Sequence, residues 1–256
     1  MPARIHQFIC RSDNFGVLVH DPVTGTTAAI DAPDGAAVLA ALDAKGWALT
    51  DVLVTHHHGD HVEGIPALKR RFPNARVVAP AKDKARIPGA DAYVAEGDDV
   101  MVGSYAAKII ATPGHTTGHI VYWFEEEDLL FAGDTLFAMG CGRVLETSML
   151  TMWESLLKLA RLPGDCQVYC GHEYTLANAR FALTVDPSND LLRQRAKEVE
   201  ALRSGGKMTL PTTISLELAT NPFLRAGDRQ LQAAVGMPGA DPGAVFAEIR
   251  ERKNRF

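Results

Sequence analysis

The chain has 256 residues, of which 46% are hydrophobic and 22% are charged, and this composition is typical of a globular protein with a sizeable core. The formal net charge of -5 argues against a general nucleic-acid-binding surface. No apolar run approaches the length of a membrane span, and the first twenty residues hold no continuous apolar segment of the secretory type. We therefore expect a cytoplasmic protein that binds neither nucleic acid nor membrane.

Short apolar runs alternate with helical patterns through the N-terminal two-thirds of the chain. Runs rich in Val, Ile and aromatic residues predict strands, and they cover residues 15–20, 26–31, 51–55, 75–80, 107–112, 119–124, 128–134 and 166–171. Helices are predicted between some of these strands, at residues 34–46, 64–72 and 147–164. For the first helix, Asp34 is a candidate N-cap and Gly46 a candidate stop.

The strand-like runs stop after Tyr174. Helical patterns follow at residues 175–186, 189–206 and 242–256. The sequence therefore predicts an α/β protein with a mixed catalytic domain, residues 1–173, and a mostly helical C-terminal domain, residues 174–256.

Four of the predicted strands end in residue types that bind metal ions. The run "DVLVT" leads into "HHHGDH", and the runs that end near residues 112, 131 and 170 lead into His115, Asp134 and His172. Strand ends are rigid, and the loops beyond them are where α/β enzymes place their chemistry. The pattern predicts a metal site with seven ligands: His56, His58, Asp60, His61, His115, Asp134 and His172.

The spacing divides these ligands between two ions. If the chain stays extended after Thr55, His56 and His58 point to one side and His57 to the other. We expect one set to consist of His56, His58 and His115, and the other of Asp60, His61 and His172. The carboxylate of Asp134 can bridge the two ions. Imidazole and carboxylate ligands suit zinc, the preferred candidate, and also iron or manganese.

A two-metal centre of this kind suits hydrolysis, because it lowers the pKa of bound water and clamps the attacking group. Catalysis is expected to depend on Asp134, Asp60 and His58. No other catalytic motif competes strongly, since the chain has neither a GxSxG elbow nor a phosphate-binding GxxxxGK[ST] loop. The stretch "GCGRVL" at residues 140–145 is interpreted as a turn near the site.

The remaining candidates receive structural interpretations. His6 and His20 are expected to be structural histidines, His57 to pack or support a ligand, and His119 to pack or donate a hydrogen bond. The cysteines, Cys10, Cys141, Cys166 and Cys170, form no CxxC pair, so we expect reduced thiols. Cys166 and Cys170 remain alternative metal ligands.

The four segments "THHHGDH", "TPGHTTGH", "FAGDTLF" and "GHEYT" resemble, in this order, the metal motifs of the metallo-β-lactamase superfamily. The resemblance implies an αββα sandwich with a two-metal site at one edge. Within the superfamily, "GDTLFAMGCGRVLE", "HEYTLANARFAL", "NPFLR" and "IRERKNRF" resemble the glyoxalase II, or hydroxyacylglutathione hydrolase, family over nearly the whole chain. That family's reaction is the hydrolysis of S-D-lactoylglutathione to glutathione and D-lactate by a hydroxide bound to two metals, in methylglyoxal degradation.

The resemblance also implies glutathione contacts at Arg143, Tyr174, Arg250 and Lys253. Glutathione carries carboxylates, which Arg and Lys bind well, and the spacing of Arg250 and Lys253 lets both face one way on a helix. The alternative is that a basic helix end simply complements the helix dipole. The chain departs from the family pattern at Leu145, where an aromatic residue is common, and at Thr147-Ser148 in place of Gly-Thr. It also has Glu63 where the family often has a second glycine.

Other functions stay open at this stage. An iron-dependent glutathione persulfide dioxygenase of the same superfamily would use a similar ligand set and a glutathione derivative. A lactonase, a nuclease or a non-catalytic metal-binding scaffold are further alternatives, although the acidic charge balance weighs against a nuclease. The intact second-metal set and the long helical C-terminal part favour the thioester hydrolase. We expect it to act on a small glutathione thioester as a monomer.

Overall fold

The computed structural model describes all residues, 1–256, and the chain forms two compact units. The first unit comprises Met1–Ala111 and Gly118–Gly133, and the second comprises Thr112–Thr117 and Asp134–Phe256. These units are defined by the contacts within each of them. The predicted boundary after residue 173 instead marks the point where strand-like sequence gives way to helical sequence. No helix has the length and apolar character needed to cross a bilayer.

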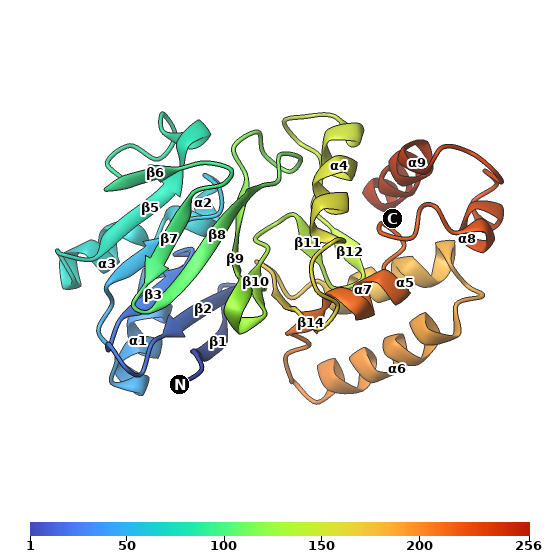
Figure 1. Ribbon diagram of the computed structural model, residues 1–256. Coiled ribbons are helices and arrows are strands. Elements are labelled where there is room, and N and C mark those ends of the chain that lie inside the picture. Colours follow the sequence, from blue (N-terminus) through green and yellow to red (C-terminus); the bar gives the residue numbers. More distant parts are fainter. The chain divides into compact units, whose positions relative to one another are not determined.

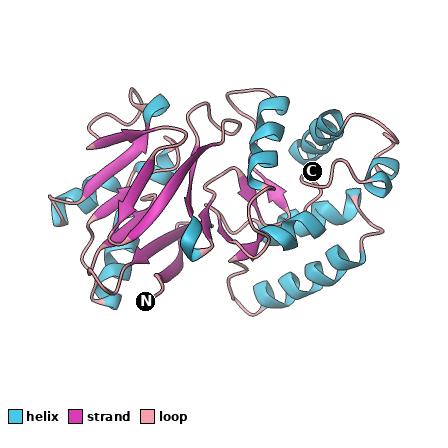
Figure 2. Cartoon of the chain, in the orientation of Figure 1, coloured by secondary structure: helices cyan, strands magenta, loops and turns pink.

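Strands dominate the first unit (Figures 1 and 2). They are β1 (Arg4–Cys10), β2 (Asn14–His20), β3 (Thr27–Ile30), β4 (Asp51–Leu53), β5 (Arg76–Pro80), β6 (Ala92–Val94), β7 (Asp99–Val102), β8 (Tyr105–Ala111), β9 (Ile120–Phe124) and β10 (Leu129–Phe131). The helices of this unit are α1 (Gly35–Lys45), α2 (Gly59–Val62) and α3 (Ile65–Arg71), with short 3-10 turns η1 (Ala81–Asp83) and η2 (Glu125–Glu127).

Strands β1 to β6 form one sheet in sequential order. The pairs β1–β2 and β2–β3 are antiparallel, whereas β3, β4, β5 and β6 are parallel. Parallel neighbours need a crossover, and α1 connects β3 to β4 while α2 and α3 lie between β4 and β5. The chain segment with the clustered histidines therefore leaves the carboxyl end of a central parallel strand.

Helices α1 and α3 cover one face of this sheet (Figure 1). The core between them contains fully buried side chains such as Leu42, Val52 and Leu68. The predicted caps of α1 are confirmed: Asp34 accepts hydrogen bonds from the backbone N–H groups of residues 36 and 37, and Gly46 ends the helix at φ 67°. A left-handed residue at this position favours glycine.

Strands β7 to β10 form an antiparallel run, with β8 beside β7 and β9, and β9 beside β10. In β8 the buried residues alternate with exposed ones, as in a sheet with one face on the core. Tyr122 in β9 donates a hydrogen bond from its hydroxyl to the carbonyl of Val54 at 2.8 Å. The N–H of Ile120 donates to the carbonyl of Thr55 at 3.0 Å. These bonds join β9 to the segment that follows β4.

Helices dominate the second unit. Its elements are β11 (Leu136–Phe137), β12 (Gly140–Cys141), α4 (Met149–Leu159), β13 (Gln167–Tyr169), α5 (Thr175–Val185), α6 (Asp190–Ser204), β14 (Thr212–Thr213), α7 (Ile214–Thr220), α8 (Arg229–Ala234) and α9 (Pro242–Arg255). Helices α5 and α6 run side by side, and α4 lies beside α9 (Figure 1). Strands β11 and β12 form a tight antiparallel hairpin.

Every predicted strand and helix is present, with ends within a few residues of the expected positions. The prediction missed β1, β6, β7, the hairpin β11–β12, β14 and the short helices α2, α7 and α8. Strand β1 has mostly half-exposed residues, so its sequence lacks the apolar run of a buried strand. The others have seven residues or fewer, and tertiary contacts rather than local pattern stabilise such short elements.

Candidate active site

Two predicted ligands lie together at the end of β4 in the first unit. His56 Nε2 is 3.0 Å from His58 Nδ1, and His56 is fully buried. The ring of His57 turns elsewhere, with Nδ1 3.2 Å from a carboxylate oxygen of Asp83. The predicted pairing of His56 with His58 is therefore present within this unit, and His57 contacts a different group, Asp83.

Asp31, at the end of β3, orients two of the histidines. His61 Nδ1 donates to Asp31 Oδ2 at 2.8 Å. Thr55 Oγ1 donates to the same oxygen at 2.9 Å and accepts from His56 Nδ1 at 3.0 Å. Because Nδ1 of both rings acts as a hydrogen-bond donor, Nε2 is the nitrogen of His56 and of His61 that suits a metal ion. The sequence analysis missed Asp31, although this residue is also a carboxylate at a strand end.

Asp60 belongs to the short helix α2, and its carboxylate is half-buried. Asn14 donates from Nδ2 to Asp60 Oδ2 at 3.1 Å and to the Asp60 carbonyl at 3.2 Å. The turn that begins at Gly59 brings His61 back towards the start of the segment, and its ring centroid lies 4.1 Å from that of His56. The first unit thus carries four predicted ligands on one short segment.

The second unit carries the other three predicted ligands. Asp134 Oδ2 is 3.5 Å from His115 Nε2 and 3.3 Å from His172 Nε2. All three side chains are buried. His115 Nδ1 donates to the carbonyl of Arg143 at 2.9 Å, so its Nε2 is the atom available to an ion.

The segment after the hairpin fixes the loop that holds His115. Thr147 donates from its hydroxyl to the Gly114 carbonyl at 3.0 Å. Glu146 accepts from the N–H of Thr117 at 2.8 Å and from its hydroxyl at 3.0 Å. A Cβ on Gly142 would lie 2.0 Å from the Asp134 carbonyl, so only glycine lets the chain pass this close to the predicted bridging residue.

The distances at Asp134 fit the coordination of divalent cations. Two ligand atoms at about 2.0–2.1 Å from a tetrahedral ion are about 3.3 Å apart. The Nε2···Oδ2 separations of 3.5 Å and 3.3 Å at Asp134 match this value better than that of a strong hydrogen bond. The donors are imidazole nitrogens and carboxylate oxygens, which suit zinc, iron and manganese. Each unit therefore carries a donor set suited to such ions.

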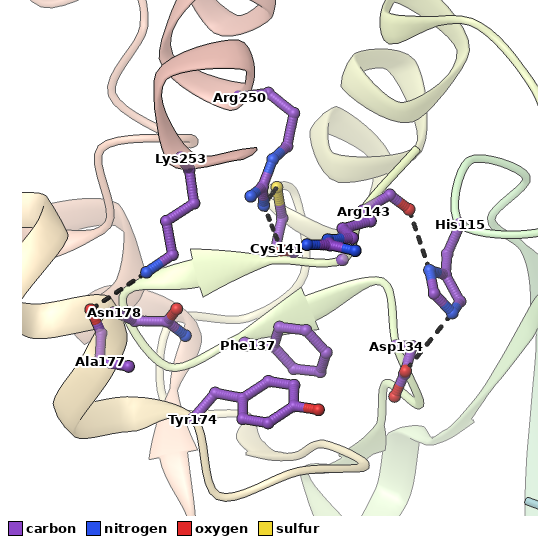
Figure 3. A pocket seen from close by; sticks show the side chains of 11 residues that line it. His115, Asp134, Phe137, Cys141, Arg143, Tyr174, Ala177, Asn178, Arg250 and Lys253 are labelled. Carbon is purple, nitrogen blue, oxygen red and sulfur yellow. Dashed lines mark hydrogen bonds and ion pairs between the residues drawn. The ribbon is translucent and has the colours of Figure 1, made fainter. Parts of the chain in front are cut away.

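A pocket of about 390 Å³ opens beside the Asp134 cluster within the second unit. Its lining residues are His115, Asp134, Phe137, Cys141, Gly142, Arg143, Tyr174, Ala177, Asn178, Arg250 and Lys253. Figure 3 shows His115 and Asp134 at one end, with Arg250 and Lys253 reaching in from α9 at the other. All four residues predicted to contact glutathione thus line one pocket together with two of the predicted ligands.

Three of the lining residues are cationic, and the only carboxylate that lines the pocket is Asp134. Arg250 is 3% exposed and donates from Nη1 to the Cys141 carbonyl at 2.8 Å. Its Nε has no hydrogen-bond partner.

Lys253 donates to the Ala177 carbonyl at 3.1 Å. Burial, with the nearby charge of Arg250, lowers the pKa of Lys253 to about 8. The buried Arg250 and the half-buried Lys253, which have no carboxylate partner in the pocket, favour an anionic ligand.

Aromatic rings form one side of the pocket. Tyr174 stacks on His172 with ring centroids 4.7 Å apart and an interplanar angle of 5°. Phe137 meets Tyr174 edge-on at 5.5 Å and 84°. The sequence analysis did not name Phe137 and Asn178, although both lie in quoted motifs, "FAGDTLF" and "HEYTLANARFAL". It did place "GCGRVL" near the site, and Cys141, Gly142 and Arg143 from that stretch line the pocket.

The remaining histidines fit their structural interpretations. His20 stacks on Trp47 at 4.3 Å, and the ring of His6 lies 5.6 Å from that of Phe8. His119 stacks on His56 at 4.9 Å. The cysteines are all buried free thiols, and burial raises the pKa of Cys141.

Two family profiles match consecutive parts of the chain. The metallo-β-lactamase superfamily profile covers residues 8–172, and the profile for the C-terminus of hydroxyacylglutathione hydrolase covers residues 173–256. The predicted metallo-β-lactamase fold with a helical C-terminal region is confirmed.

Full-length relatives agree with the two profiles. The hydroxyacylglutathione hydrolase of Rhodopseudomonas palustris (strain BisA53) is 54% identical over 255 residues, covering 100% of both chains. That of Brucella ovis is 55% identical over 252 residues, covering 98% of both chains. The crystal structure of ETHE1 from Myxococcus xanthus is similar with a TM-score of 0.68 and 26% identity, covering 98% of both chains. The chain belongs to the hydroxyacylglutathione hydrolase family of the metallo-β-lactamase superfamily.

Proposed function

We propose that this chain hydrolyses 2-hydroxyacyl thioesters of glutathione, with S-D-lactoylglutathione as the substrate and glutathione and D-lactate as the products. The observation that carries the proposal is the pocket that joins two predicted metal ligands, His115 and Asp134, to the cations Arg143, Arg250 and Lys253. Full-length identity of 54–55% to hydroxyacylglutathione hydrolases supports the same activity. In this role the enzyme removes the thioester that forms in methylglyoxal degradation.

The cationic end of the pocket suits the carboxylates of glutathione. Arg250 is held in place by the Cys141 carbonyl, yet only part of its guanidinium is engaged. A carboxylate would supply the missing acceptor in a buried setting, where charge-assisted hydrogen bonds are strongest. Lys253 lies 5.1 Å from the centroids of the Phe181 and Phe256 rings. These rings restrict the position of the ammonium group.

We propose that the seven predicted residues hold two divalent cations: His56, His58, Asp60, His61, His115, Asp134 and His172. When bound, these ions supply a water of lowered pKa and polarise the thioester carbonyl. Zinc is our preferred metal, and iron and manganese fit the same donors. Asp60 and Asp134 supply the only negative charge among the seven residues, so the loaded site stays cationic and suits an anionic transition state.

The residues of the second unit would orient the substrate for this chemistry. Arg143 contributes its side chain to the pocket and its carbonyl to His115. Tyr174, stacked on His172, offers a flat wall along which the peptide part of glutathione can lie. Fixing the γ-glutamyl-cysteinyl-glycine portion against Arg250 and Lys253 restricts where the acyl end can lie, and restricting a reactive group raises the rate. The departing glutathione thiolate needs little protonation, because thiols are fairly acidic.

The test is hydrolysis of S-D-lactoylglutathione by the purified protein, with metal content measured on the same sample. We expect rapid turnover with about two metal ions per chain. The D-lactoyl thioester of a small neutral thiol is the matched control substrate. It carries the same acyl group but no carboxylate, so it should react with a much higher KM.

Absence of turnover in the metal-loaded protein would refute the proposal. Oxygen uptake with glutathione persulfide would then support the dioxygenase alternative predicted from the sequence. Equal KM values for the two thioesters would remove Arg250 and Lys253 from substrate recognition. We further propose that the protein is cytoplasmic and monomeric. Sedimentation of the purified protein would test its oligomeric state.

A further inference from the structure

The hairpin β11–β12 makes an unusual turn at Met139. This residue has φ 52°, in the left-handed region that side chains larger than glycine seldom adopt. Its side chain is fully buried, in the core between α5 and α6. A left-handed methionine persists only where the surroundings hold it, so the contacts of this turn require an explanation.

Side chains from two helices hold the turn. Glu217 in α7 accepts from the N–H of Met139 through Oε2 at 2.8 Å. Asn221, which follows α7, donates from Nδ2 to the carbonyls of Phe137 at 3.1 Å and Gly140 at 2.9 Å. Asn178 in α5 donates to the carbonyl of Ala138 at 3.1 Å. Each residue of the turn therefore has a backbone group fixed by a helical side chain.

Glu217 is itself firmly held. It is fully buried, and its Oε1 accepts from Arg195 Nη2 at 2.6 Å and from the Thr212 hydroxyl at 2.6 Å. Asn221 Nδ2 lies 2.9 Å from Oε2 of Glu217. One oxygen of the carboxylate thus faces the cation of α6 and the other faces the hairpin. Buried ion pairs add little net stability over apolar residues of the same shape, so stability alone is a weak reason for this arrangement.

The hairpin and its flanks supply much of the proposed substrate pocket. Of the eleven lining residues, five lie between positions 134 and 143: Asp134, Phe137, Cys141, Gly142 and Arg143. The N–H of Gly142 donates to the Thr135 carbonyl at 3.2 Å, which ties the two ends of the hairpin together. Phe137 also meets His172 edge-on at 6.2 Å. A shift of the turn would therefore move both the pocket wall and the Asp134 backbone.

We propose that Glu217, together with Asn221, is a positioning residue for catalysis: it fixes the β11–β12 hairpin and thereby the pocket wall and Asp134. The inference rests on the proposed thioester hydrolysis for its kinetic consequences. Its structural content, the anchoring of the hairpin by α7, does not depend on the substrate.

The test replaces Glu217 by glutamine in the full-length, metal-loaded protein. The two oxygens of Glu217 each accept from donors, on opposite sides. The amide nitrogen of Glu217→Gln must therefore face a donor whichever way the side chain turns. We expect kcat/KM for S-D-lactoylglutathione to fall at least tenfold with normal metal content. Peptides that span residues 134–143 should exchange their amide hydrogens at least tenfold faster.

Asp186→Asn is the matched control. Asp186 is 1% exposed and accepts from Arg225 Nε at 3.1 Å and Asn189 Nδ2 at 2.9 Å, so it is an equally buried carboxylate in the same helical region. It has no bond to the hairpin. Its replacement should lower Tm but change kcat/KM less than twofold at a temperature well below the transition. The exchange of residues 134–143 should stay as in the wild type.

A second variant, Asn221→Ser, covers the case in which Glu217→Gln does not fold. Serine keeps the Glu217–Arg195 pair but removes the amide that reaches both hairpin carbonyls, so the same kinetic and exchange effects are expected. Equal losses of kcat/KM in Asp186→Asn and the hairpin variants, or unchanged exchange at residues 134–143, would overturn the proposal. If the wild type hydrolyses no thioester, the proposed function fails, and the exchange measurement alone decides whether α7 anchors the hairpin.

Discussion

Lys253 should make substrate recognition dependent on pH. Burial of its ammonium group favours the neutral form, and the charge of Arg250 adds to this, so the pKa falls to about 8. The positive charge is therefore present below about pH 8 and lost above it. If Lys253 binds a carboxylate of glutathione, kcat/KM must fall as the pH rises through this value, because kcat/KM reports ionisations of the free enzyme.

The size of the effect follows from the pKa. Most of the side chains carry the charge at pH 7 and most are neutral at pH 9, so kcat/KM should fall by up to about tenfold between these values. A hydrogen bond to a charged group contributes about 1.5–3 kcal/mol, which corresponds to roughly ten- to 150-fold in binding. The fall should therefore level off once the neutral amine dominates and the residual binding comes from the other contacts.

The assay compares the wild type with Lys253→Arg and Lys253→Met from pH 7 to 9.5. Arginine stays charged throughout, so the ratio of wild type to Lys253→Arg should drop by up to about tenfold between pH 7 and 9. Ionisations of the substrate and of the metal site affect both proteins equally, so their effects on kcat/KM cancel in this ratio. Lys253→Met should be weaker at pH 7 and should converge with the wild type at high pH. A wild-type to Lys253→Arg ratio that stays constant over this range would refute the reasoning.

Three further predictions concern metal binding and stability. Alanine at Asp134 or His58 should abolish turnover and lower the metal content, and full activity with normal metal in either variant would contradict the ligand assignment. Asp31→Ala removes the acceptor that orients His61, so metal affinity measured by chelator competition should fall about ten- to 100-fold. Leu192→Ala, in the fully buried core of α5 and α6, should cost about 2–5 kcal/mol in urea unfolding while leaving KM unchanged.

The seven candidate metal ligands could be selected from the sequence because each one follows an apolar strand. An apolar composition rich in β-branched residues predicts a strand, and a metal-binding residue directly after it is easily recognised. Asp31 obeys the same rule after "TTAAI" and could have been found in this way. Its role depends on a contact with His61, 30 positions further along the chain, which the local sequence does not show.

The pocket wall could not be predicted so fully. The motifs mark the segments that hold Phe137 and Asn178, but the roles of these two residues come from contacts between segments about 40 residues apart. The role of the short helix α7 also depends on a contact between distant segments. "ISLELAT" has too few residues for a clear helical period, yet its Glu217 supports the hairpin through a bond that spans 78 positions. Local pattern does not contain such pairings.

The second unit places residues proposed for substrate recognition and for metal binding on a common segment. Asp134 begins it, the hairpin and Arg143 line the pocket, and Glu146 and Thr147 hold the loop of His115. Hydrolysis needs the thioester carbonyl at a fixed position relative to the ions, and an error of about 1 Å in that position can cost two orders of magnitude in rate. The pocket wall and the candidate metal ligand Asp134 lie on one short segment, which side chains of α5 and α7 hold in place. Their positions are therefore directly coupled. We infer that the helical C-terminal residues act on catalysis in two ways: α9 supplies the cations that bind the substrate, and α7 keeps the hairpin in register with the metal ligands.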